Sequence, residues 1–228
     1  PSPTAPSHSV MNEPHAPLNM DRSLRVVVET ASMDWERSPA AGVWRKKLER
    51  AGSESGLVTS VVRYQPGSTF AEHAHPLGEE IFVLAGVFAD EHGEYPAGTY
   101  LRNPPGSRHS PRSPAGCELF VKLDQFDPED VETVRVRTGE SAWHPGLVDG
   151  LSVMPLHSFG VEHTALVRWA PGTVFKPHHH PGGEIHCLLD RMRHEHHGLS
   201  IALPDLEQLM LKEPPGQCVQ GTERLIHQ

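Results

Sequence analysis

The chain has 228 residues, 37% apolar and 21% charged, a composition typical of a globular protein with room for one large β domain or two domains of about 100 residues. Its formal charge of −9 argues against a nucleic-acid ligand, and no run of about 18 apolar residues is present to span a membrane. The three widely separated cysteines predict neither a disulfide framework nor a cysteine-based zinc site, so we expect a cytoplasmic protein.

The first 20 residues are rich in proline, serine and alanine and show no hydrophobic period. We therefore expect a disordered tail over residues 1–20, because such a segment has too few large apolar side chains to offset its ordering entropy. It contains neither the basic start nor the apolar stretch of a secretory signal.

Short apolar runs bounded by turn residues follow this tail, which is the pattern of β-strands. They predict strands over residues 24–28, 57–64, 81–84, 99–101 and 117–123. Segments containing proline and glycine separate the runs and favour tight reversals. Residues 44–51 show a weak helical pattern, and the chain as a whole predicts an all-β fold.

An internal repeat divides the chain into two copies. Residues 62–70, VRYQPGSTF, recur as residues 167–175, VRWAPGTVF, and a His-x-His pair and a Gly-Glu pair follow both segments at the same spacing. Trp35 and Trp143 form a looser pair upstream. We therefore predict two similar β-barrels that divide near residue 140.

Histidines and a glutamate in the first copy have the spacing of metal ligands. His73 and His75 lie two apart in an extended segment, so both imidazoles point to one side. A turn can bring the Glu79 carboxylate to the same point, and His109, just after a rigid Pro-Pro-Gly turn, is the natural fourth ligand. Three histidines and one glutamate suit iron, manganese, zinc, nickel or copper better than calcium or magnesium. We predict one divalent transition metal, with iron or zinc as the first candidates and manganese or nickel next.

These residues and the glycines around them resemble the two motifs of the cupin superfamily. The matching positions are Gly67, His73, His75, Glu79 and Gly86 in the first motif, and Gly98, Pro104, Gly106 and His109 in the second. Ser113 stands where the second motif usually has asparagine, which is not a metal ligand. The string over residues 78–100 is similar to the ChrR-like cupins in particular.

The resemblance implies two tandem cupin barrels, that is, double-stranded β-helix or jelly-roll domains. The first covers residues 21–139 with a complete metal motif, and the second covers residues 140–228 and diverges after about residue 185. His178, His180 and Glu184 repeat three of the ligands, but Val219 occupies the position of the fourth.

Whether the second copy also binds a metal is therefore left open, and we expect partial occupancy of such a site at most. Three nearby side chains could supplement its ligands: His179, His186 and Cys218. The strand pattern expected after residue 198 is missing, and either a remodelled site or a reading-frame error late in the gene would explain this.

Two classes of function use the four ligands of the first copy. In the first class, Fe(II) keeps positions for a chelating substrate and O2, and the protein is a non-haem dioxygenase-type enzyme for a small diketone or hydroxyketone. Phe70, Phe82 and Tyr100 are then candidates for an apolar pocket wall. In the second class, implied by the ChrR-like resemblance, the protein is a zinc-binding sensor or regulatory cupin without catalytic activity.

The expected partner is a small-molecule ligand or substrate, not a nucleic acid or a membrane, and a homodimer is left open. Fuller ChrR-like relatives carry a small zinc-dependent domain that restrains a sigma factor, and no such segment is found here, so we expect no sigma-factor partner. Other reactive residues are expected to be structural: Glu80 as surface charge, Cys117 as a small core residue and His92 as a solvated loop side chain.

Overall fold

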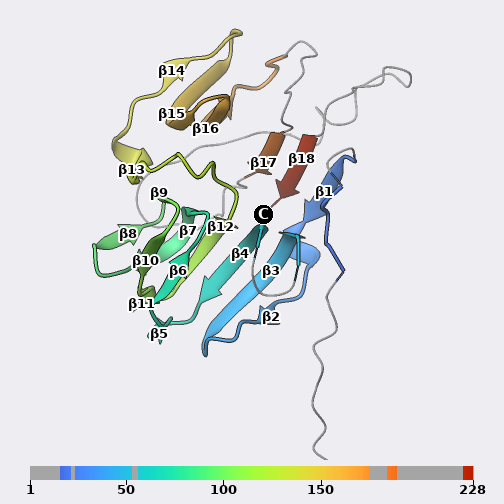
Figure 1. Ribbon diagram of the computed structural model, residues 1–228. Helices are drawn as coiled ribbons and strands as arrows, with labels where there is room; N and C mark the ends of the chain where they lie inside the picture. Colours follow the sequence, from blue (N-terminus) through green and yellow to red (C-terminus); the bar gives the residue numbers. More distant parts are fainter. Residues whose placement is uncertain (1–15, 22–23, 53–55, 175–183, 189–222, 228) are drawn as a thin grey trace, which may run out of the picture.

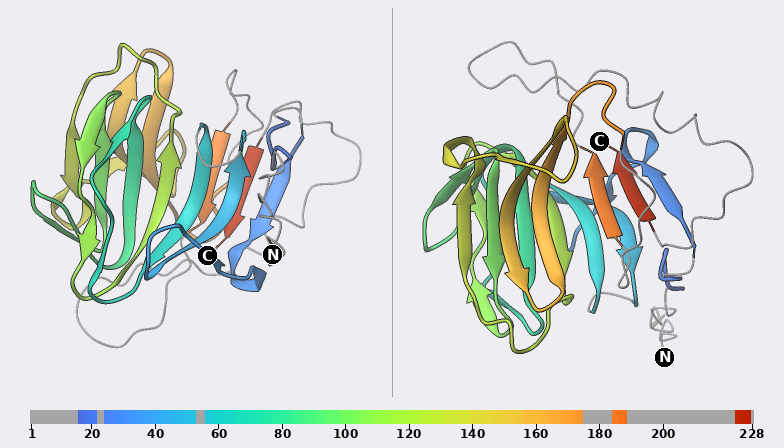
Figure 2. Two further views of the ribbon diagram at one scale, coloured as in Figure 1. Left: turned by 60° about the horizontal axis from the view of Figure 1, so that its bottom comes forward. Right: turned by 90° about the horizontal axis from the view of Figure 1, so that it is seen from above.

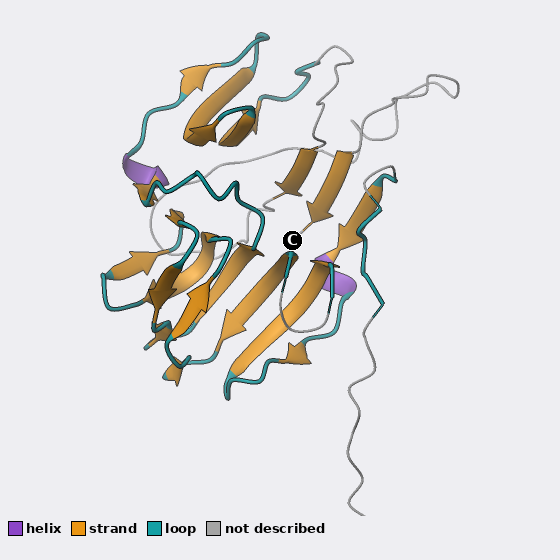
Figure 3. Ribbon diagram, in the orientation of Figure 1, coloured by secondary structure: helices purple, strands orange, loops and turns teal. Residues whose placement is uncertain are grey.

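The computed structural model describes residues 16–21, 24–52, 56–174, 184–188 and 223–227. Over these residues the chain consists of strands and turns, with two short 3-10 turns, η1 (Thr30–Ser32) and η2 (Thr138–Glu140) (Figures 1 and 3). The strands are β1 (Val26–Glu29), β2 (Glu36–Arg37), β3 (Val43–Arg50), β4 (Val58–Tyr64), β5 (Ser68–Thr69), β6 (His73–His75), β7 (Glu79–Ala89), β8 (Glu94–Pro96), β9 (Thr99–Asn103), β10 (Ser107–His109), β11 (Arg112–Ser113), β12 (Cys117–Leu123), β13 (Val134–Arg137), β14 (His144–Pro145), β15 (Leu151–Phe159), β16 (Glu162–Trp169), β17 (Glu184–Leu188) and β18 (Glu223–His227). The predicted all-β fold is confirmed.

The largest sheet of the described chain is centred on β7 and β12. Its strand order is β13-β9-β7-β12-β4-β3-β2, with β8 paired to β7 and β11 paired to both β5 and β7. β6 and β10 form a separate antiparallel pair. The buried side chains of the first copy form one cluster: Val43, Tyr64, Ile81, Val83, Phe88, Tyr95, Leu101, Cys117, Leu119 and Val121. Cys117 is thus a core residue as predicted, and burial raises the pKa of its thiol to about 11.

Strands of the second copy pack on the first copy at two places. The sheet β14-β15-β16 covers the outer face of β7, β9 and β13, where Met154 and Leu156 pack with Tyr100 and Phe82. On the other side, Ile185 of β17 packs with the cluster of Leu48 and Val61 on β3 and β4. β17 pairs in parallel with β18, and β18 pairs in parallel with β1 (Figure 2).

The start of the second copy repeats the start of the first copy, element by element. β1, η1, β2 and β3 recur in the same order and with the same lengths, within one residue, as β13, η2, β14 and β15. Arg37 lies opposite Trp44 between β2 and β3, as Pro145 lies opposite Ser152 between β14 and β15. These strands agree with the repeat, and the division into barrels over residues 21–139 and 140–228 stays a prediction.

Two sequence predictions about the N-terminal region are wrong. Residues 44–51 are not helical, because β3 pairs with β2 on one side and with β4 on the other. The tail does not extend to residue 20, because the backbone of Leu18 exchanges two hydrogen bonds with Arg50 and the Asn19 side chain donates to the Leu48 carbonyl. Residues 1–15 lie outside the described residues.

Glu80 was expected to be a surface charge, and this expectation is also wrong. Its side chain does point away from Glu79, but the β15–β16 hairpin covers that face of the sheet. The carboxylate accepts hydrogen bonds from Tyr100 Oη at 2.6 Å and Thr164 Oγ1 at 3.1 Å, and Lys122 Nζ lies at 3.0 Å. Burial alone would raise the pKa of Glu80, but Lys122, Tyr100 and Arg102 hold it below its ordinary value.

None of the helical segments in the described residues is long and apolar enough to cross a membrane.

Candidate metal centre

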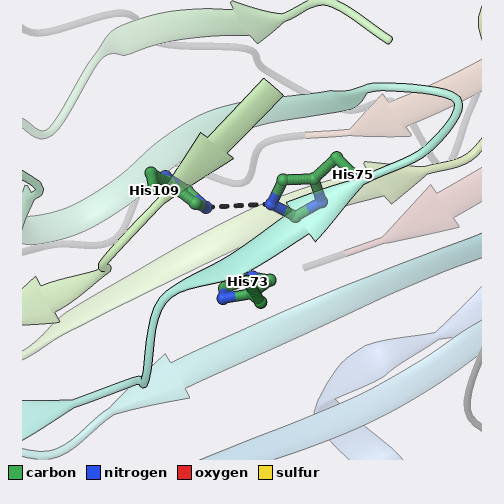
Figure 4. A group of neighbouring side chains, drawn as sticks. All are labelled: His73, His75 and His109. Carbon is green, nitrogen blue, oxygen red and sulfur yellow. Dashed lines mark hydrogen bonds between the residues drawn. The ribbon is translucent and has the colours of Figure 1, made fainter. Parts of the chain in front are cut away.

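β6 and β10 bring the three predicted histidines together (Figure 4). The two strands pair antiparallel with His109 opposite His73, and alternation along β6 puts His73 and His75 on one face. Each histidine offers one ring nitrogen to this cluster, and the three nitrogens all lie within 4.8 Å of one another. The His75 and His109 Nε2 atoms are 3.0 Å apart.

Glu79 begins β7 and reaches the same point from the turn after β6. Its Oε2 atom lies 3.5 Å from His75 Nε2 and 3.3 Å from His109 Nε2. Gly78 makes this turn with a φ of +82°, and a Cβ there would meet the Phe126 ring at 2.1 Å, so a side chain is excluded on both grounds. Neighbouring ligands of one ion at about 2.1 Å are about 3 Å apart. The His75, His109 and Glu79 atoms have about this spacing, and the His73 donor lies within 4.8 Å of those of the other two histidines.

The outer ring nitrogens of His73 and His109 each face an acceptor oxygen, which leaves Nε2 for the ion. His73 Nδ1 lies 2.9 Å from the Ala71 carbonyl oxygen, which only accepts, so Nδ1 carries the hydrogen. His109 Nδ1 faces the Asp90 carboxylate. Burial lowers the pKa of His75 and outweighs the opposing effect of Glu79, which favours the neutral imidazole that a metal requires. Burial also disfavours charge on His109, but Asp90 and Glu79 raise its pKa.

Behind these groups lies a set of polar residues that the sequence did not single out. Asn103 Nδ2 donates to Glu79 Oε2 at 2.8 Å, and Arg135 Nη2 donates to Asn103 Oδ1. Asp90 stands behind His109. The one available signal was the Asp-Glu-His-Gly turn at residues 90–93, because aspartate and glycine at these places are typical of a turn that the side chain closes.

The three predicted pocket aromatics have different positions. Phe70 is half-buried, with its ring centroid 4.8 Å from that of His73, so it lies beside the cluster. Phe82 and Tyr100 do not, since they pair across β7 and β9 and pack in the cluster with Met154 on the opposite face of the sheet. Assigning these two to the pocket wall is therefore wrong. Phe88 lies on the inner face instead, with its ring 6.2 Å from that of His109.

The side chains of the three ligands proposed for a second metal site lie outside the part of the chain that the structure describes. His178 and His180 lie outside the described residues, and Glu184 is described by its backbone alone, as the first residue of β17. His92, expected to be a solvated loop side chain, is 61% exposed, and this prediction is confirmed.

An all-β fold that presents a His-x-His strand and a third histidine at one buried point defines a cupin. The family model described as the ChrR Cupin-like domain matches residues 23–127 and again residues 131–200. The chain therefore belongs to the ChrR cupin-like family.

Similar solved structures cover part of the chain. An acetylacetone dioxygenase from Acinetobacter johnsonii is 19% identical over 46% of this chain and 80% of its own, with a TM-score of 0.35. In the Rhodobacter sphaeroides complex of SigE with the anti-sigma ChrR, the matched chain is 22% identical over 41% of this chain and 50% of its own, with a TM-score of 0.35. The protein Ylba from E. coli is 13% identical over 64% of both chains, with a TM-score of 0.49. The comparison with curated proteins found no match.

Proposed function

We propose that the first copy binds one divalent transition metal through His73, His75, His109 and Glu79. We further propose that the protein is a non-haem dioxygenase-type enzyme acting on a small diketone or hydroxyketone. The observation that carries the proposal is the convergence of imidazole nitrogens within 4.8 Å of one another, with the Glu79 carboxylate 3.3–3.5 Å from two of them.

The charge of this ligand set supports an anionic oxygen ligand. Three neutral imidazoles and one carboxylate leave a divalent ion with a net charge of about +1, which favours an enolate over a neutral ketone. Asn103 donates to the Glu79 oxygen that faces the histidines and so holds that carboxylate in place. When bound as Fe(II), the ion supplies Lewis acidity and an accessible second redox state.

The surroundings of the three histidines indicate where a substrate would enter. His75 and His109 are buried, whereas His73 is half-buried and lies next to the half-exposed surface pair of Arg108 and Glu72. The open side of the cluster is therefore the side of His73, where Phe70 provides apolar surface. Phe88 lies on the core side, where it excludes water from the ligands.

An oxygen electrode tests the enzymatic proposal. Fe(II)-loaded protein should consume O2 when offered a β-diketone or an aryl hydroxyketone, and Zn-loaded protein should not, because zinc has no second redox state available. The His109→Ala variant should be inactive, and His92→Ala, which alters an exposed loop histidine, should match the wild type. Failure of the Fe(II), Mn(II) and Ni(II) forms to turn over any of these ketones would overturn the enzymatic proposal.

The family match favours a second candidate, a zinc-binding sensor or regulatory cupin without catalytic activity. It uses the same four ligands, with the small molecule bound as a signal. A compound that raises the thermal midpoint of the zinc form, and does so through His73 and His109, would support it when no metal form shows turnover.

A further inference from the structure

Asp90 stands directly behind His109, on the side away from the other ligands. The Asp90 Oδ2 and His109 Nδ1 atoms are 3.6 Å apart, and the two side chains are 1% and 3% exposed. Neither atom has a hydrogen-bond partner elsewhere in the described part of the chain. We propose that Asp90 is a positioning residue, which fixes the tautomer of His109 so that the Nε2 lone pair is presented to the metal. This inference rests on the proposed metal site.

The orientation of Asp90 is fixed by its other oxygen. Oδ1 accepts hydrogen bonds from the His92 amide at 2.8 Å, the Gly93 amide at 3.1 Å and Tyr95 Oη at 3.2 Å. Arg112 Nη1 also donates to the Asp90 carbonyl oxygen at 2.6 Å. Backbone and carboxylate are thus both held, and Oδ2 is directed to His109.

A carboxylate only accepts hydrogen bonds, so a nitrogen that faces it must carry the hydrogen. In His109 this places the hydrogen on Nδ1 and the lone pair on Nε2, the atom that lies 3.0 Å from His75 Nε2 and 3.3 Å from Glu79 Oε2. The Nδ1 to Oδ2 distance exceeds that of a hydrogen bond by less than about 1 Å, so a small movement of the ring toward Asp90 would close it. Metal-bound histidines generally donate their outer N–H in this way, and loss of the acceptor weakens metal binding about 10–100-fold.

His73 provides a contrast within the same site. Its Nδ1 donates to the neutral carbonyl of Ala71, which no side-chain substitution removes. For His109 the acceptor that faces Nδ1 is the side chain of Asp90, and a charged acceptor makes a stronger hydrogen bond than a neutral carbonyl does. A substitution at Asp90 can therefore change the tautomer of one ligand alone.

The Asp90→Asn substitution is the sharpest test, because asparagine keeps the size of the side chain and the Oδ1 acceptor. Its amide NH2 replaces Oδ2 and would donate to His109 Nδ1, moving the ring hydrogen to Nε2 and removing the lone pair needed by the ion. We expect zinc affinity, measured by competition with a chromophoric chelator, to fall about 10–100-fold. Glu91→Gln is the matched control, since this neighbouring, exposed carboxylate accepts from the Ser110 amide and should leave zinc affinity unchanged.

Two further measurements separate the tautomer of His109 from the stability of the fold. Nitrogen-15 NMR of the zinc-loaded wild type should show His109 with its hydrogen on Nδ1, and the metal-free Asp90→Asn protein should keep the thermal midpoint of the metal-free wild type. Unchanged zinc affinity in Asp90→Asn, or a His109 that binds zinc through Nδ1, would overturn the role of Asp90 while leaving the metal site intact. A wild type that binds no metal would instead remove the proposed function, and this inference with it.

Discussion

The β3–β4 hairpin of the first copy and the β15–β16 hairpin of the second have the same construction but different polar partners. In the first hairpin, Thr59 donates to Glu49 within the hairpin itself, at 2.6 Å. At the corresponding position of the second hairpin, Thr164 donates to Glu80 of the first copy, and His157, which corresponds to Glu49, lies 2.8 Å from Asp130. The two hairpins thus have equivalent strands, but Thr164 and His157 of the second hairpin bond to residues of the first copy and not within the hairpin.

The apolar contacts of the two hairpins are reciprocal. Leu48 of the first hairpin packs in a cluster with Ile185 of the second copy, and Leu156 of the second hairpin packs in a cluster with Phe82 of the first. Each hairpin therefore buries apolar surface against strands of the other copy. Within the described residues the three-histidine cluster lies in the first copy, and His178 and His180 of the second copy lie outside those residues.

The largest expected effect is on metal binding, and it tests which copy holds the metal site. His73→Ala or His109→Ala should weaken metal binding by more than the roughly 100-fold that marks the upper cost of losing an outer partner, because a ligand itself is removed. His178→Ala in the second copy should leave about one metal per chain, as measured by elemental analysis after purification.

The control for this experiment is His92→Ala, which should bind metal as the wild type does because His92 is an exposed loop residue. Metal that disappears with His178 and persists in His73→Ala would assign the working site to the other copy.

Glu80 provides the next test, because it joins the first copy to the hairpin of the second copy. Glu80→Gln removes the carboxylate that Lys122 faces at 3.0 Å, whereas Arg102 keeps Asp130 and Glu162. Breaking a buried pair typically costs about 3–5 kcal/mol of unfolding free energy. Chemical denaturation at neutral pH measures this loss. Glu140→Gln, at an exposed pair with Arg137, should leave stability unchanged.

The pH dependence of unfolding also tests the role of Glu80, and its direction follows from the pKa of the carboxyl group. The pKa of Glu80 is lower in the folded protein than its ordinary value of 4.5, so the unfolded chain binds more protons as the medium becomes acidic. The stabilisation from Glu80 is present above pH 4.5 and is lost as the pH falls below it. Glu80→Gln should therefore show a shallower loss of stability on acidification, and an unchanged slope would contradict the buried network.

Much of this arrangement follows from local sequence patterns. The strand of His73 and His75 and the return of Glu79 were predictable, because alternation and a glycine turn are local properties. His109 was predictable from its turn and from the cupin motif. The repeat was visible because residues 62–70 and 167–175 share five of their nine residues without a gap.

What the sequence did not reveal depends on contacts between distant strands. Glu80 does point outward from β7, but no local pattern shows that the β15–β16 hairpin covers it. The pairing of β7 with β12 shifts register between Glu118 and Leu119, and this irregularity reverses which residues of β7 face inward. Phe82 precedes this shift and lies outside, as alternation from the inward Glu79 requires. Phe88 follows the shift and lies inside, which a strict period of two could not predict.

A third prediction compares equivalent leucines of the two hairpins. Leu48→Ala and Leu156→Ala should each lower the unfolding free energy by about 2–5 kcal/mol, since both side chains are buried in clusters shared between the copies. Urea denaturation of the two variants gives the comparison. A large loss for Leu48→Ala with none for Leu156→Ala would mean that the second hairpin is not an integral part of the fold.

The smallest expected effect concerns a cation–π pair that both copies contain. The guanidinium of Arg63 lies 4.0 Å from the centre of the Trp35 ring, and that of Arg168 lies 4.0 Å from the Trp143 ring. Such pairs contribute about 0.5–2 kcal/mol, depending on exposure. We expect double-mutant cycles on the two pairs to give equal coupling energies, measured from denaturant midpoints.

Single substitutions would not show this equality, because the first pair has additional partners. Arg63 also contacts Glu118 at 2.6 Å, and Lys46 Nζ lies 4.5 Å from the Trp35 ring. Arg63→Ala should therefore lower the unfolding free energy more than Arg168→Ala does. The double-mutant cycle cancels the extra contacts, because they are lost whether or not the tryptophan is present. A coupling energy for Trp35 with none for Trp143 would mean that the second pair has the same geometry but does not stabilise the fold.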